Sequence, residues 1–143
     1  MLIAVSLTPD DNDTVRVSCP DLPEVHTFGE TEAEALEHAG EAVLLALQGR
    51  ILDRMEVPAF RRPRKGERFV ELGSRVAAKL AVYRAMRARG WRKADLARAM
   101  KAPPSDIDRL LNLRFRTSHE ALDGALAALG LAAEIKVRSV EAA

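Results

Sequence analysis

The segment Lys93–Asn112, with the sequence KADLARAMKAPPSDIDRLLN, decides the fold of the second half of the chain. Its opening stretch, KADLARAM, has the apolar spacing of a short helix, and Pro104–Asn112 has that of a second one. Lys101–Pro103 between them predicts a tight break. Two short helices joined by a three-residue turn are typical of the helix-turn-helix motif. The small Ala97 would let the helices cross closely, and Ile107 would supply the opposing apolar contact.

A longer helix is predicted before this motif. Ser74 can cap it, and Gly90 is suited to end it after about Arg89. Its apolar stripe consists of Val76, Leu80, Tyr83 and Met86.

A further helix is predicted after the motif, beyond a basic loop at Leu113–Arg116. Thr117 and Glu120 have the spacing of a capping box, and Gly130 is placed to stop the helix. Its apolar positions are Leu122, Ala125, Leu126 and Leu129. Leu131–Val137 then predicts a terminal strand, which has no partner in an otherwise all-helical domain.

The first half of the chain predicts a small sheet and one helix. Short strands are expected at Leu2–Leu7, Thr14–Ser18 and Val25–Phe28, with a turn at Thr8–Asp13. A helix follows, running to about Arg54, and a linker at Val57–Arg68 leads to a possible fourth strand at Phe69–Leu72. Thr31 and Glu34 predict a capping box for the helix, and its expected core stripe is Leu36, Gly40, Val43, Leu47 and Ile51.

These elements predict an α+β protein with two small domains, residues 1–72 and 73–143. The length of 143 residues and the 48% apolar content allow this. One cysteine, Cys19, excludes a disulfide framework and a Cys-cluster zinc site, and a buried, inert thiol is expected. The longest apolar run, Ala42–Leu47, is far shorter than the about 20 residues of a membrane span. No secretion signal is visible at Met1–Pro9, so we expect no membrane association and a cytoplasmic location.

The net charge of +1 conceals a split between the two halves. Residues 1–60 hold twelve acidic and three basic side chains, a net charge of −9. Residues 61–143 hold nineteen basic and nine acidic ones, a net charge of +10. A basic half suits a polyanion such as DNA, whereas an acidic half would repel nucleic acid and attract a basic partner.

In a helix-turn-helix motif the N-terminal part of the second helix faces the major groove of DNA. The residues there are Pro104, Ser105, Asp106, Asp108 and Arg109. Arg109 could grip a guanine or a phosphate through two hydrogen bonds. Lys93, Arg114 and Arg116 lie where phosphates could be met.

A catalytic first domain is the less favoured alternative. Metal-dependent nucleases hold their ions with carboxylates on rigid strands, and the two expected strands Leu2–Leu7 and Thr14–Ser18 carry none. His26, His38 and His119 form no metal-ligand pattern. We therefore expect no catalytic residues, no metal and no cofactor.

The whole pattern resembles the HicB-type antitoxins that carry an Xre-like helix-turn-helix. The run Cys19–Thr31 and its continuation Glu32–Ala42 are similar to that family's PDLP…T.G[DE]T..EA…A.EA pattern. Asp95–Met100 and Ile107–Asn112 resemble its two helix-turn-helix elements. The chain departs from the pattern at Lys101, where glycine is usual, at Pro103 in the cap position, and at Asp108, where a small hydroxyl residue is usual.

The resemblance implies a partial RNase H-like N-terminal domain, ordered β-β-β-α-β, that binds and blocks a HicA-type mRNA-cleaving toxin. It implies a C-terminal domain that binds double-stranded operator DNA, and a homodimer or tetramer. Candidate toxin contacts are Asp21, Glu24, Glu34, Glu37 and Glu41. Two alternatives remain: a stand-alone transcription regulator with a ligand-sensing N-terminal domain, and a vestigial RNA-processing enzyme. We expect Leu131–Val137 to pair with its copy in a second chain.

Overall fold

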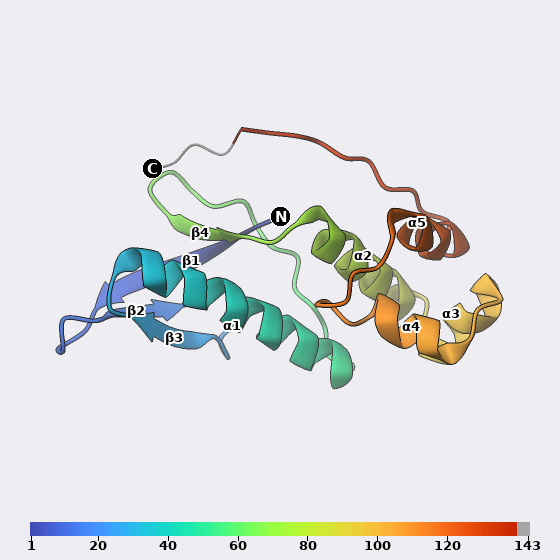
Figure 1. Ribbon diagram of the computed structural model, residues 1–143, viewed down its shortest axis with the longest axis horizontal. Helices are drawn as coiled ribbons and strands as arrows, with labels where there is room; N and C mark the ends of the chain where they lie inside the picture. The colour runs from blue at the N-terminus through green and yellow to red at the C-terminus, as the bar shows by residue number, and fades with distance from the viewer. Residues whose placement is uncertain (140–143) are drawn as a thin grey trace.

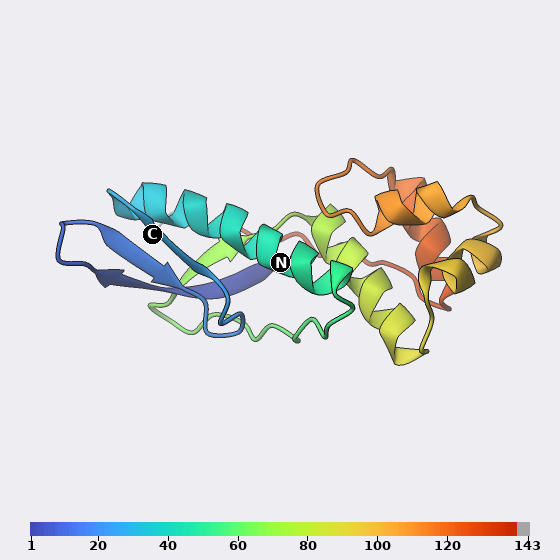
Figure 2. The same cartoon turned by 90° about the horizontal axis from the view of Figure 1, so that it is seen from below.

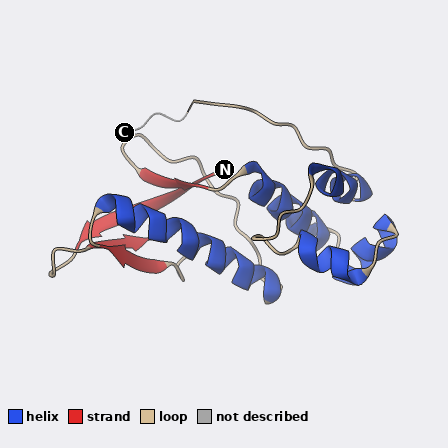
Figure 3. Cartoon of the chain, viewed as in Figure 1, coloured by secondary structure: helices blue, strands red, loops and turns tan. Residues whose placement is uncertain are grey.

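A computed structural model describes residues 1–139 of the chain (Figure 1). Its strands gather at one end of the molecule, with α1 lying along them, while the remaining helices occupy the other end (Figure 3). In chain order the elements are β1 (Leu2–Pro9), β2 (Val15–Ser18), β3 (His26–Gly29), α1 (Glu32–Leu52), β4 (Arg68–Glu71), α2 (Ser74–Ala88), α3 (Lys93–Met100), α4 (Pro104–Leu110) and α5 (His119–Ala128). The predicted α+β class and the order of elements are confirmed, except at the C-terminal segment. Within residues 1–139, no helix has the length and apolar content needed to span a membrane.

The four strands form one antiparallel sheet in the order β3-β2-β1-β4. Ile3 faces Val70 across the β1–β4 pair, and Leu7 faces Val17 across the β1–β2 pair. The alternation along the strands places Ile3, Val5 and Val17 in the core, each no more than 3% exposed. Figure 2 shows the sheet as one layer and α1 as a second layer lying along it.

The buried stripe of α1 differs from the predicted one in its first half. The structure buries Ala35 and Ala39 completely, whereas Leu36 and Gly40 are only partly buried. The reason is the close approach of the helix to β3: a Cβ on Gly29 would meet the backbone nitrogen of Ala35 and would lie 2.7 Å from its Cα. Only small side chains fit where the two elements touch. The second half of the stripe, Val43, Leu47 and Ile51, is buried as predicted.

We expect Gly29→Ala to lower the free energy of unfolding by about 2 kcal/mol, because the added methyl group overpacks this contact against the backbone. Gly40→Ala is the matched control, since nothing lies within 4 Å of a Cβ there. In that helical position alanine should stabilise the protein by about 0.5–1 kcal/mol. Urea denaturation of both variants measures the difference, and equal stabilities would refute the close approach.

The helix ends confirm some predicted caps and correct others. The hydroxyl of Thr31 accepts from the Glu34 amide at 3.1 Å, as expected for the cap of α1. Ser74 makes no cap, because it is the first residue of α2 and Gly73 takes the N-cap position. The cap of α5 is Ser118, whose hydroxyl accepts from the Ala121 amide at 3.1 Å. Thr117, the predicted cap, is instead buried between the helices.

The turn between α3 and α4 contains one of the departures from the family pattern, Lys101. Lys101 has φ +53° and ψ +42°, the left-handed conformation that glycine adopts most easily. Lys101 therefore stands in a backbone conformation that favours the glycine usual at this position.

The predicted terminal strand is wrong for the single chain. Leu131–Ser139 is assigned no regular structure, and Ile135 and Val137 are largely exposed. The segment runs back toward the sheet (Figure 1), where Arg138 pairs with Glu71. A strand needs a neighbouring strand to hydrogen-bond with, and this segment pairs with none of the described strands.

Candidate nucleic-acid interface and acidic helix face

The exposed side of α4 carries most of the residues predicted to contact DNA. Ile107 and Leu110 are at most 2% exposed and fix the inner side of the helix against the core. This leaves Pro104, Ser105, Asp108 and Arg109 exposed on the outer side, while Asp106 is half-buried. Arg114 and Arg116 are exposed in the loop that follows. A short helix so presented has the geometry of a recognition helix.

The two acidic residues of α4 are each paired with a base. Asp108 lies 2.8 Å from the ammonium of Lys93, and Asp106 lies 3.3 Å from the guanidinium of Arg109. Arg109 also stacks over the ring of Phe115 at 5.7 Å. The repulsion that these carboxylates would exert on phosphates is therefore offset locally. The Lys93–Asp108 ion pair joins α3 to this surface, and the contact between Arg109 and Phe115 joins the loop after α4 to it.

A buried lysine, which the sequence analysis missed, holds the loop behind this surface. Lys79 of α2 is fully buried, and its ammonium donates to the carbonyls of Arg109 at 3.0 Å, Asn112 at 2.6 Å and Phe115 at 2.8 Å. Burial and the nearby charge of Arg75 lower the pKa of Lys79 to about 8. The group still carries its charge at neutral pH, as three carbonyl acceptors require.

A glutamine of α1 binds the same loop from the other side. The side-chain amide of Gln48 donates to the Leu111 carbonyl at 3.1 Å, and its oxygen accepts from the Leu113 amide at 2.7 Å. Gln48 thus ties the helix of the first half to the end of α4. Its position on the outer side of the α1 stripe gave no sequence signal for this contact.

A cleft of about 810 Å³ opens between the end of α1 and the helix-turn-helix. Lys93 and Asp108, both predicted interface residues, lie on its wall. Its remaining walls come from the ends of α1 and α2 and from the α2–α3 turn. The cleft therefore borders the candidate interface on the side of the first half.

The acidic residues predicted to contact a toxin lie in two separate places. Glu37 and Glu41 are exposed on the first half of α1, with Glu34 partly exposed beside them. Asp21 and Glu24 lie in the β2–β3 loop, and Glu24 binds Arg50 near the far end of α1. From residue 34 to residue 50 the helix rises by about 24 Å. The structure therefore does not bring the two groups together.

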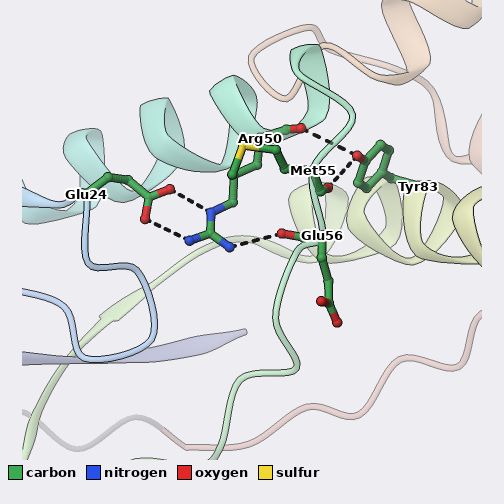
Figure 4. A network of polar contacts seen from close by, with 5 residues as sticks. All are labelled: Glu24, Arg50, Met55, Glu56 and Tyr83. Atoms are coloured by element: carbon green, nitrogen blue, oxygen red, sulfur yellow. Dashed lines mark hydrogen bonds and ion pairs between the residues drawn. The ribbon is translucent and has the colours of Figure 1, made fainter.

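Glu24 already has a partner within the chain. Both of its carboxylate oxygens accept from Arg50, at 2.6 and 2.9 Å (Figure 4). The hydrogen bonds from Arg50 lower the pKa of Glu24, which stays ionised at neutral pH. Three exposed or partly exposed carboxylates on α1, Glu34, Glu37 and Glu41, remain available to a basic partner.

Among residues 1–139, the remaining titratable groups do not form a catalytic or metal-binding cluster. Cys19 is 2% exposed, and burial raises the pKa of its thiol, as expected of an inert cysteine. His38 contacts the Phe28 carbonyl at 2.7 Å, which raises the pKa of its imidazole. Within residues 1–139, no group of three or more His, Cys, Asp or Glu side chains is placed to hold a metal ion.

Comparisons with known proteins give two domain matches. A family model described as HicB_like antitoxin of bacterial toxin-antitoxin system matches residues 3–81. A helix-turn-helix domain model matches residues 67–138. The two matches overlap over β4 and the start of α2.

Several curated relatives match most of the chain. It is 37% identical to Antitoxin HicB 2 of Photorhabdus laumondii over 80% of this chain and 81% of that protein. It is 35% identical to Antitoxin HicB of Escherichia coli strain K12 over 91% of this chain and 94% of that one. Among solved structures, the N-terminal domain of Burkholderia pseudomallei antitoxin HicB matches with a TM-score of 0.44 and 23% identity, over 51% of this chain and 99% of that one.

Proposed function

Because this chain belongs to the HicB-like antitoxin family and carries a helix-turn-helix domain, we propose that it inhibits a HicA-type mRNA-cleaving toxin and represses its own operon. The observation that carries the proposal is the combination of the two domains in one chain with opposite net charges. An inhibitor of an RNA-binding protein must attract a basic surface, whereas a repressor must attract DNA. We propose no catalytic role, and a location in the cytoplasm, where an mRNA-cleaving toxin and operator DNA would both be met.

On the toxin side, we propose that residues 1–72 form the inhibitory domain and that the acidic face of α1 steers it to the toxin. Glu34, Glu37 and Glu41 follow one another at helical spacing on α1. None of them forms an ion pair with a lysine or arginine of the described residues. A ribonuclease needs a basic surface to hold RNA. Complementary charges of this kind raise the association rate of two proteins.

On the DNA side, we propose that residues 73–143 bind the operator through α4 and the loop after it. Arg109→Ala should weaken binding to the DNA upstream of the gene by about 2 kcal/mol. Arg98→Ala is the matched control. Arg98 lies on α3 and, like Arg109, forms an ion pair with the aspartate three residues before it. Fluorescence anisotropy with a labelled operator fragment measures both. Equal affinities of the two variants would remove Arg109 from the interface.

We further propose that the protein acts as a homodimer or tetramer. Leu131, Ile135 and Val137 are exposed along an extended segment, and dimers of helix-turn-helix proteins bind two half-sites. Deleting residues 131–143 should give monomers in analytical ultracentrifugation and weaken operator binding. A deletion variant that stays dimeric would exclude this segment as the dimer contact.

A further inference from the structure

The cleft beside α4 has an apolar floor and a basic rim. Its floor includes Tyr83 and Met86 of α2 together with Trp91 of the following turn. Four cationic side chains line its rim: Arg54, Arg87, Arg92 and Lys93. Asp108 is the one acidic residue among those that line the cleft, and it is paired with Lys93. The cleft therefore carries a clear excess of positive charge.

Two of these cations are available to a ligand. Arg54 and Arg92 are exposed, and neither forms an ion pair with a carboxylate of the described residues. Three arginines elsewhere in the chain are instead held by carboxylates: Arg50 by Glu24, Arg61 by Glu67, and Arg68 by Glu32. Exposed guanidinium groups that face one cleft are suited to an anion, above all to a phosphate.

Arg54 belongs to the first half of the chain, but the second half fixes its position. Its backbone has φ +56°, and its carbonyl accepts from Arg87 of α2. The neighbouring carbonyls are held as well, Met55 by the hydroxyl of Tyr83 at 2.6 Å and Glu56 by Arg50 at 3.0 Å (Figure 4). Gln48 ties α1 to the loop after α4. Arg54 therefore has a defined place relative to α4.

The cleft opens beside the DNA-facing side of α4. Asp108 and Asn112, both exposed on α4 or at its end, line the cleft together with Lys93. A helix in the major groove has a phosphodiester strand on each of its two sides. Arg114 and Arg116 follow α4 and are available to one strand. The cleft lies on the side of α4 that faces the end of α1, so its rim borders one of these two strands.

We propose that the first half of the chain takes part in DNA binding, with Arg54 and Arg92 holding a phosphodiester strand of the operator at the rim of this cleft. The inference rests on the proposed operator binding and extends it from the helix-turn-helix to the end of α1. Both arginines contact phosphates and so contribute to affinity for any sequence, not to the choice of bases.

The test measures operator affinity of the full-length protein as a function of salt. Arg54→Gln and Arg92→Gln should each lower the affinity roughly three- to tenfold and reduce the slope of log K against log salt by about 1. The ratio of operator affinity to that for a scrambled duplex should stay the same. Arg62→Gln and Arg64→Gln are the matched controls, because these exposed arginines lie in the loop before β4, away from the cleft. Thermal unfolding of all four variants checks their folding.

The outcomes separate the inference from the function on which it rests. If the wild-type protein binds its upstream DNA and Arg54→Gln keeps the wild-type affinity and salt slope, the end of α1 does not touch DNA and the inference is wrong. If Arg62→Gln and Arg64→Gln weaken binding as much, the effect is one of net charge and the inference also fails. If the wild-type protein ignores its upstream DNA, operator binding itself fails, whereas toxin inhibition is untouched.

Discussion

Replacing Lys79 with methionine is expected to lower the free energy of unfolding by about 3 kcal/mol. Methionine keeps the length of the side chain but leaves the carbonyls of Arg109, Asn112 and Phe115 without the ammonium that they share. Hydrogen bonds to a charged donor are worth about 1.5–3 kcal/mol each, and the three act on one group, so their energies do not add. Urea denaturation at neutral pH, where Lys79 is charged, measures the loss.

The same substitution should also weaken operator binding, because the loop that Lys79 holds carries Arg114 and Arg116. Lys65→Met is the control, since Lys65 is exposed in the loop before β4 and should change stability by less than about 0.5 kcal/mol. The account is wrong at this point if the two variants unfold alike. It is also wrong if Lys79→Met loses stability but its remaining folded fraction binds DNA like the wild type.

Reversing the three acids of the α1 face, Glu34→Lys, Glu37→Lys and Glu41→Lys together, is expected to weaken toxin binding roughly 100-fold or more. Attraction to a basic partner becomes repulsion, which slows association and penalises the docked complex. Surface plasmon resonance with the immobilised toxin measures both rate constants. Most of the change should appear in the association rate and should shrink as salt is added.

The matched control reverses three exposed acids in the other half, Glu120→Lys, Asp123→Lys and Glu134→Lys. It changes the net charge by the same amount but leaves α1 intact. Toxin affinity close to that of the wild type is expected for this control. Equal losses in the two triple variants would show that only net charge matters, and would remove the α1 face from the proposed interface.

Much of the fold could be predicted because periodicity and local signals determine it. The sequence predicted every strand and helix that the structure describes, and α3 has the predicted bounds, but it also predicted a terminal strand at Leu131–Val137 that the structure does not show. The errors arose where another element decides. Ala35 is buried in place of Leu36 because β3 approaches α1 closely at Gly29. The spacing of residues within one helix does not show how close a strand lies to it. Thr117 has the spacing of a cap, yet tertiary packing buries it and leaves the role to Ser118.

The exposed residues of the candidate DNA interface could be predicted better than the residues that hold the interface in place. A recognition helix follows from its place in the motif, so the exposed residues of α4 were predictable. Gln48 and Arg54 act through contacts with segments far along the chain, which no local pattern reveals. For Lys79 one signal did exist: position 79 lies three residues after Val76 and four before Tyr83, on the apolar stripe of α2. A lysine at such a position must find acceptors within the core.

Inhibition of RNA cleavage tests the central proposal most directly. The HicA-type toxin that we propose as the partner is incubated with a labelled mRNA while the purified full-length protein is titrated in. We expect cleavage to stop at about one antitoxin chain per toxin molecule. The triple variant Glu34→Lys, Glu37→Lys and Glu41→Lys should need a large excess. Undiminished cleavage at a tenfold molar excess of the wild-type protein would contradict the proposed function.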